Sequence, residues 1–387
     1  MLCLASSLLV ACGGGDDEGD GESGFDAPSD STAPDDGTTA DAPEDTSSSD
    51  VTMEGLVGLI PDQPGASDLV IVNEYGPATE AAGVEQPEAG ADEGTINDWF
   101  VAIGRGREGQ PGLGLSTNGF FGSRPTDDAG WRQELGWAPI DVTGAVESLV
   151  GDDFPGLYAF TGDFDPEAID EAVHEDPVWG DQLEIVEHSG VEYYSWGEDN
   201  ATSMDVTVVR EFGRGGRMAV LDDHTILWSW ATAPLEGGID AALGETDSLA
   251  DNAEIGPLAQ TMDAAGALAA ILTADGDAYR GTGSDTPTLV PYTALASGTG
   301  SGDDGAELHL AFLHDDAGAA EENAGRIETI VDEGTTLDGQ PWSEIVALGN
   351  VQTTDDILLV TLQITDPEDV GLWNLIVFER DPLLASA

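Results

Sequence analysis

The stretch Leu308-His309-Leu310-Ala311-Phe312 decides the fold prediction, because its first, third and fifth residues are large and apolar and share one face of a β-strand. A helix is predicted over Ala317–Gly334, since apolar residues recur there at spacings of four, three and four. Strands are predicted next at Val346–Gln352 and Ile357–Ile364. Asp366-Pro367-Glu368 then opens a last helix, with Pro suited to its first turn.

An earlier segment has the same order of elements. Leu157–Phe160 is a predicted strand, and Asp165-Pro166-Glu167 opens a helix because Asp can cap the free amides of the first turn. Two strands with a loop between them are predicted next, at Val191–Trp196 and Met218–Trp230. Two helices follow, at Gly238–Leu243 and Ile255–Leu272. We therefore expect an α+β fold with two related βαββα-type portions, residues 51–285 and 286–387. Each would have an antiparallel or mixed sheet with helices packed on one face.

The beginning of the first portion carries further predicted elements. Asp68–Val72 is expected to be a buried strand, and Pro77–Ala82 a short helix that Gly83 ends. Trp99–Ile103 is expected to be another strand, followed by a Gly-rich stretch over residues 104–122. About 335 residues after position 50 are more than one core usually serves, which favours two domains.

Near the amino terminus, an apolar run ends in Leu9-Val10-Ala11-Cys12 and is followed by three glycines. This stretch resembles a lipobox, the cleavage and acylation site of bacterial lipoproteins. The resemblance implies that residues 1–11 are a signal peptide, that Cys12 is lipidated, and that the protein is anchored on the extracytoplasmic face of the cell membrane. Arg105 is the first basic residue, so we expect the signal peptide to be truncated at its start.

Residues 12–50 have the composition of a tether. Residues 13–50 contain thirteen acidic residues, no basic residue and one aromatic, Phe25. Such a segment buries too little apolar surface to offset its ordering entropy, so we expect a disordered acidic linker. No stretch of the chain approaches the roughly 20 apolar residues of a membrane-spanning helix, so the expected attachment to the bilayer is covalent.

The charge of the chain excludes several partners. Seventy-seven Asp and Glu stand against ten Arg and no Lys, for a formal charge of -67. This excludes nucleic acid and anionic lipid headgroups as partners. The acidity fits salt adaptation, or weak association of divalent cations. Cys3 and Cys12 are the two cysteines, so a thiolate metal site and thiol catalysis are excluded from the folded part.

The globular part resembles uncharacterised lipoproteins of high-GC Gram-positive bacteria. The segments that carry this resemblance are Leu135–Val142 with the helix opened at Asp165, and Glu321–Ala324 with Gln340–Glu344. The resemblance implies a fold and a location but no activity.

Five of the ten arginines lie in two Gly-rich stretches: Arg105, Arg107, Arg210, Arg214 and Arg217. Guanidinium groups pair bidentately with carboxylates and phosphates, so these residues are the predicted site if the protein captures a small anion. The alternative is internal bracing, in which each Arg pairs with nearby Asp or Glu.

Other motifs give weaker signals. Gly104–Gly109 matches G-x-G-x-x-G, but no helical pattern follows it, so nucleotide binding is not expected. Asp275-Gly276-Asp277, Asp303-Asp304 and Asp315-Asp316 lack the spacing of a calcium loop, and Asp315 or Asp316 fits a helix cap better. Three of the nine tryptophans lie near Gly-rich loops and could form an exposed sugar-binding platform: Trp99, Trp131 and Trp137.

The sequence thus predicts a membrane-anchored lipoprotein that acts as a non-catalytic binding or scaffold module of the cell envelope. Its partner would be an envelope protein, a glycan or a small solute. No cofactor, metal site or catalytic residue is predicted. The alternatives are a weak hydrolase of envelope material and a small-anion-binding protein.

Overall fold

The computed structural model describes residues 51–387, apart from 108–109, 116–118, 123, 150–155, 177–178, 181, 203, 205, 211–212, 282–287, 303–304 and 366–369. The described residues form one compact unit. The predicted signal peptide, Cys12 and tether lie outside the described residues.

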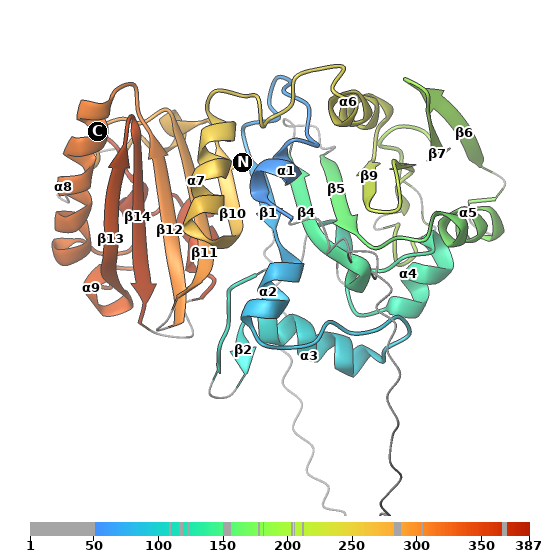
Figure 1. Cartoon of the computed structure of the whole chain (residues 1–387), viewed down its shortest axis with the longest axis horizontal. Coiled ribbons are helices and arrows are strands. Elements are labelled where there is room, and N and C mark those ends of the chain that lie inside the picture. The colour runs from blue at the N-terminus through green and yellow to red at the C-terminus, as the bar shows by residue number, and fades with distance from the viewer. Residues whose placement is uncertain are drawn as a thin grey trace, which may run out of the picture. The chain divides into compact units, whose positions relative to one another are not determined.

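A single sheet of twelve strands runs through this unit, in the order β13-β14-β12-β11-β10-β1-β4-β5-β9-β8-β7-β6 (Figure 1). All its neighbouring strands are antiparallel. The strands are β1 (Val70–Asn73), β4 (Val142–Ser148), β5 (Leu157–Gly162), β6 (Leu183–His188), β7 (Val191–Trp196), β8 (Gly216–Val220), β9 (Thr225–Ser229), β10 (Ala267–Thr273), β11 (Ala294–Gly302), β12 (Gly305–Leu313), β13 (Val346–Thr354) and β14 (Ile357–Ile364). A separate ribbon pairs β2 (Gly106–Arg107) with β3 (Gln110–Pro111).

The helices are α1 (Met53–Val57), α2 (Tyr75–Ala81), α3 (Glu93–Ile103), α4 (Asp128–Leu135), α5 (Pro166–Glu175), α6 (Thr232–Ala242), α7 (Ile255–Ala265), α8 (Ala317–Glu333), α9 (Trp342–Ile345) and α10 (Leu372–Phe378). The described α-helices and antiparallel strands confirm the predicted α+β class.

The two ends of the sheet are built on one plan. At one end, the hairpin β4–β5 is followed by α5 and by β6 to β9, and β9 returns beside β5. At the other end, the hairpin β11–β12 is followed by α8 and by β13–β14, and β14 returns beside β12. The predicted boundary between the two portions, at residues 285/286, falls between β10 and β11. These two strands pair with each other, so the sheet is continuous across the boundary.

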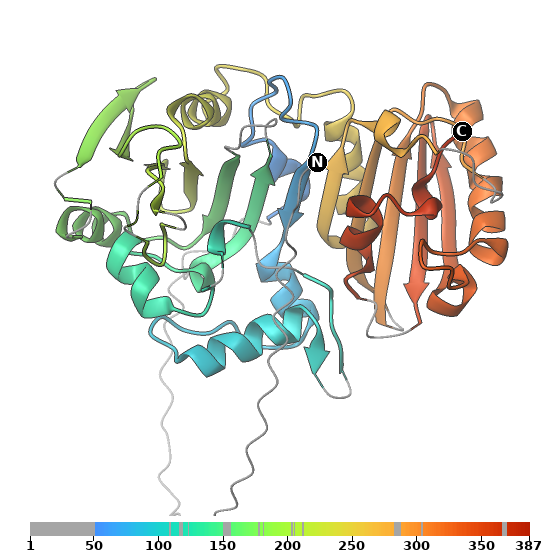
Figure 2. The same cartoon turned by 180° about the vertical axis from the view of Figure 1, so that it is seen from behind.

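Helices cover both faces of the sheet. In residues 286–387 all three described α-helices lie on one face, as expected, whereas in residues 51–285 they lie on both faces, which corrects the expectation for that portion. One face carries α2 to α5 and α8 to α10 over a large aromatic cluster. The opposite face carries α1, α6 and α7 over a smaller aliphatic cluster. α7 lies in front of the sheet in Figure 1, and α10 (red) lies in front of it in the reverse view of Figure 2. All seven residues of β10 are buried, because its strand is covered on both sides.

The two halves of the sheet meet where β1 pairs with β10 and α1 packs against α7. Asp263 of α7 accepts hydrogen bonds from the backbone amides of Met53 (2.7 Å) and Glu54 (3.0 Å), which caps α1. Burial, and then the charge of Asp263, raise the pKa of Glu74 to about 8. The joint therefore combines an aliphatic contact with a buried carboxyl that is protonated at neutral pH.

Several predicted elements are confirmed. Leu308, Leu310 and Phe312 face the aromatic cluster from β12. Asp165 caps α5 by accepting from the amides of Glu167 and Ala168, at 3.0 and 3.2 Å. Asp316 caps α8 by accepting from the amide of Ala319 at 3.0 Å.

Three predicted elements are wrong. Met218–Trp230 is not one strand, because the chain turns back between β8 and β9, which pair with each other. Ile255–Leu272 is not one helix: α7 ends at Ala265, Gly266 adopts φ +75°, and β10 begins at Ala267. Trp99–Ile103 is the end of helix α3 rather than a strand, because Asp92 caps a helix that already begins at Glu93. The helix opening at Asp366-Pro367-Glu368 falls largely on undescribed residues, and α10 begins at Leu372.

Candidate functional site

A hollow of about 780 Å³ lies between α5 and the strands β6, β7 and β8. We call it the α5 hollow. It is lined by Pro166, Asp170, His174, Ile185, Glu187, Gly190, Val191, Glu192, Tyr193, Tyr194, Val220, Leu221 and Asp222.

Local sequence sets both walls of the α5 hollow. Ile169 and Val173 anchor α5 in the aromatic cluster, which leaves Asp170 and His174 on the side of the hollow. The floor includes Tyr194, which faces Ile185 across the β6–β7 ladder. Ile185 is 47% exposed, so the hollow offers an apolar surface that solvent reaches.

Polar contacts hold the aromatic floor in place. The Tyr194 hydroxyl donates to a carboxylate oxygen of Asp170 at 2.9 Å. His174 Nδ1 lies 2.8 Å from the Asp170 carbonyl oxygen and 3.2 Å from its carboxylate. Burial and the hydrogen bond to Asp170 raise the pKa of Tyr194 above its usual value, so its phenol remains a neutral donor. The contacts among Asp170, His174 and Tyr194 hold the Tyr194 ring in position, and none of these three side chains is arranged as a nucleophile.

The rim of the α5 hollow is acidic. Among its lining residues, four are Asp or Glu and none is Lys or Arg: Asp170, Glu187, Glu192 and Asp222. A ligand with a positive group would meet complementary charge at the rim and an apolar surface on the floor.

A smaller hollow, of about 550 Å³, lies between α4 and α5. Its cation, Arg132, is held by Asp128 (2.9 Å) and Asp141 (2.7 Å). The guanidinium group is therefore used to join α4 to the turn before β4, which makes this hollow a weaker binding candidate.

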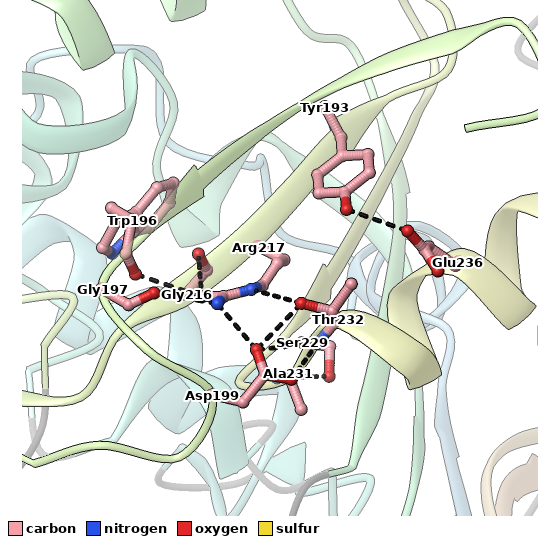
Figure 3. Close-up of polar contacts among 10 residues, drawn as sticks. All are labelled: Tyr193, Trp196, Gly197, Asp199, Gly216, Arg217, Ser229, Ala231, Thr232 and Glu236. Atoms are coloured by element: carbon pink, nitrogen blue, oxygen red, sulfur yellow. Dashed lines mark hydrogen bonds and ion pairs between the residues drawn. The ribbon is translucent and has the colours of Figure 1, made fainter. Parts of the chain in front are cut away.

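Arg217, one of the five arginines of the predicted anion site, is braced internally (Figure 3). It is 4% exposed and forms a 2.7 Å ion pair with Asp199. Its guanidinium group also donates to the hydroxyl of Thr232 and to the carbonyl oxygens of Trp196, Gly197 and Gly216. Asp199 in turn accepts from the amide and hydroxyl of Thr232, at the start of α6. Arg217 thus ties β7 and β8 to α6.

The other arginines of the predicted anion site have different contacts. The Arg210 guanidinium lies 4.2 Å from the Trp179 ring centroid and donates to the carbonyl oxygen of Arg214 at 3.2 Å. Arg214 lies 5.8 Å from the Trp230 ring centroid. Arg105 is exposed beside the β2–β3 ribbon, and the side chain of Arg107 is outside the described part. The structure brings Arg210, Arg214 and Arg217 into one region, and Arg105 lies by the separate β2–β3 ribbon.

A buried pair of one carboxyl and one phenol, which the sequence did not indicate, lies on the aromatic face. Glu147 of β4 faces Tyr158 of β5, and its carboxylate accepts from the Gly119 amide at 3.2 Å. Burial raises the pKa of Glu147 to about 7, although the bonds from Gly119 and Tyr158 lower it. Tyr158 also bonds with Trp230, and its pKa is raised well above the usual value, first by burial. Neither Glu147 nor Tyr158 lines either hollow.

The predicted exposed tryptophan platform is wrong. Trp99, Trp131 and Trp137 are 2%, 0% and 1% exposed and belong to the aromatic cluster. Their Gly-rich neighbours fold over them, with Phe120 stacked on Trp137 at 6.1 Å between ring centroids. These indoles stabilise the core instead of offering a surface to sugars.

The remaining motifs have local roles. Of the G-x-G-x-x-G match, residues 104–107 follow helix α3 and enter β2, and residues 108–109 lie outside the described part. Asp275 caps a short turn by accepting from the Ala278 amide, and Asp303-Asp304 lies outside the described residues. Across the described residues, no group of three His, Cys, Asp or Glu side chains could hold a metal ion. In that same part of the chain, no helix is both long and apolar enough to cross a bilayer.

Comparison with known proteins adds the following. No family model matches the chain, and no curated protein matches it. Among solved structures, crystal forms I, III and IV of TP0453 match with TM-scores of 0.39, 0.39 and 0.38 and identities of 9%, 10% and 9%. Each match covers 82% of this chain and 96%, 96% or 94% of the TP0453 chain. A likeness at this level carries no argument about function.

Proposed function

We propose that this protein is a lipid-anchored lipoprotein on the extracytoplasmic face of the membrane, where it acts as a non-catalytic binding module of the cell envelope. The lipobox-like Leu9-Val10-Ala11-Cys12 and the acidic composition of residues 13–50 support the anchor. The α5 hollow is the binding surface in this proposal.

The observation that carries the binding role is the combination of an exposed apolar floor and an acidic rim in the α5 hollow. A segment with a basic side chain next to an apolar one fits it. The charged head would lie near Glu187 and Glu192, while apolar atoms would pack on Ile185 and Tyr194. The partner in this proposal is therefore a basic, partly apolar segment of an envelope protein.

Calorimetric titration with the peptide acetyl-Leu-Arg-Leu-amide tests the hollow. We expect saturable binding that Glu192→Gln weakens by roughly two- to five-fold, the usual effect of one exposed ion pair. Ile185→Ser should weaken it as well, because the floor loses apolar area.

Glu328→Gln is the matched control, because Glu328 is an exposed carboxylate on α8, far from the hollow in sequence and sheet order. It removes the same charge and should leave the affinity unchanged. Equal losses from Glu192→Gln and Glu328→Gln would mean that the peptide responds to the overall charge of -67, and the assignment of the hollow would be withdrawn.

Mass spectrometry of the mature amino terminus tests the anchor. The expected product begins at an acylated Cys12 and partitions into detergent, and Cys12→Ala should move the protein to the aqueous phase. Native protein recovered with residues 1–11 intact and Cys12 unmodified would contradict the anchor while leaving the hollow to be tested by titration.

The alternatives have less support from the described residues. A hydrolase needs its acid or base within reach of substrate, whereas Glu147 is 6% exposed and lines neither hollow. Capture of a small anion needs guanidinium groups that are free to bind it, whereas Arg217 is ion-paired with Asp199.

A further inference from the structure

The two terminal strands of the sheet, β6 and β13, differ in charge. In the described part of the chain each has one edge without a neighbouring strand. β6 carries Glu184 and Glu187 within six residues, and charged side chains are a common means of keeping a sheet edge from pairing with another chain. β13 is nine residues long, VALGNVQTT, and contains no charged residue.

β13 is uncharged and largely exposed, although the chain as a whole has a charge of -67. A basic partner would gain from carboxylates along this edge, whereas an acidic partner would be repelled by them. Because this edge has no carboxylates, it would not repel an acidic partner. A second copy of this chain is such a partner, since its charge is also -67. We propose that β13 pairs edge to edge with β13 of a second copy, which joins the two sheets about a twofold axis.

The turn after β13 fixes which groups face outward. β13 and β14 are joined through Asp355 and Asp356, with Asp355 at φ +53°. In a two-residue hairpin the flanking pair, here Thr354 and Ile357, exchanges both backbone hydrogen bonds. The alternation of an antiparallel ladder then turns the N–H and C=O groups of Thr353 and Val351 toward the open edge.

This pattern selects one register for the dimer. With Gln352 on the twofold axis, Val351 pairs with Thr353 of the partner subunit, and Thr353 with Val351 of the partner subunit, through outward-facing backbone groups. Gln352 is exposed and would face its own copy, so two neutral amides meet at the axis. The register shift between Leu348 and Asn350 lies outside these pairs and would not disturb them.

Salt should control this association. The contact strands are uncharged, but the acidic remainder of each copy repels the other copy at low ionic strength. At molar NaCl the Debye length falls to about 3 Å, which removes most of this repulsion. Sedimentation velocity of the full chain with Cys3→Ser and Cys12→Ser should therefore show the 40.0 kDa monomer at low salt and twice that mass at molar salt.

Thr353→Pro removes the outward amide of β13 without removing a bond to β14, and it should raise the dimer dissociation constant by roughly ten-fold or more. Glu187→Pro is the matched control. It stands one residue before the flanking pair of the β6–β7 hairpin, His188 and Val191, on the opposite edge of the sheet. It should leave the dimer unchanged.

Gln352→Glu is a second variant that keeps the backbone intact and places two carboxylates across the axis, so it should also favour the monomer. Gln352→Cys should cross-link into a disulfide dimer under mild oxidation, since opposed residues at such a position are close. A monomer at every salt and protein concentration, or a dimer that Thr353→Pro and Gln352→Glu both leave intact, would overturn the proposal. So would a chain that stays monomeric while β13 takes up a strand of another protein.

Discussion

At the scale of single residues, Glu147 is a carboxyl that is buried on the aromatic face. It is 6% exposed, and burial raises its pKa to about 7 from the ordinary value of 4.5. The unfolded chain therefore releases this proton at a lower pH than the folded chain. Folding becomes less favourable as pH rises from about 4.5 to about 7 and stays so above that range.

Glu147→Gln removes this titration and retains an acceptor for the Gly119 amide. Relative to the wild type, the variant should gain free energy of unfolding on going from pH 4.5 to pH 8, by at most about 3 kcal/mol. Urea unfolding at both pH values measures this change in the free energy of unfolding. Glu328→Gln, measured in the same way, corrects for the loss of one negative charge. A difference that does not change with pH would contradict the assigned environment of Glu147.

The buried environment of Glu147 and the ion pair between Arg217 and Asp199 could not be predicted from the sequence. Glu147 lies in a strand whose other residues are small or apolar, and nothing local shows that Tyr158 and the Gly119 amide meet it. The Asp199 partner of Arg217 lies eighteen positions away, in a loop. Bracing was foreseen as an alternative because arginines are few in this chain, but the partners depend on how β7, β8 and α6 come together.

At the scale of elements, the amino-terminal caps show how local chemistry fixes a helix. Asp316 accepts from the Ala319 amide, whereas its neighbour Asp315 has no such role in the cap of α8. Asp316→Ala should lower the free energy of unfolding by about 1 kcal/mol, and Asp315→Ala, which removes the same charge, should have a smaller effect. Thermal or urea unfolding of the two variants makes the comparison. Equal losses would mean that charge, and not capping, sets the effect.

Helices and strands that bury one face could be predicted from the sequence more readily than those that bury both faces. β12 alternates in residue size and α8 has a clear helical period, so both were predicted from sequence. Ala267–Thr273 is apolar at nearly every position because it is covered on both sides, and such a run has no period that separates a strand from a helix. The same two-sided burial explains why helices were expected on one face but lie on both in residues 51–285.

At the scale of the whole molecule, the charge of -67 is the dominant property. Self-repulsion acts against the compact state, and salt screens it. The melting temperature should therefore rise between low and molar NaCl, with an equal concentration of a neutral osmolyte as the control for excluded-volume effects. A melting temperature that is unchanged or lower at molar NaCl would contradict this.

The position of β1 has a consequence for how the protein forms. This strand is near the beginning of the folded part, yet it lies between β4 and β10, and Val70 faces Leu272. Contacts between residues about 200 positions apart slow folding, because the chain entropy is lost before the contact forms. A chain released residue by residue leaves one side of β1 open until β10 emerges, so β1 cannot be paired on both sides before residue 273 of the 387 has been made.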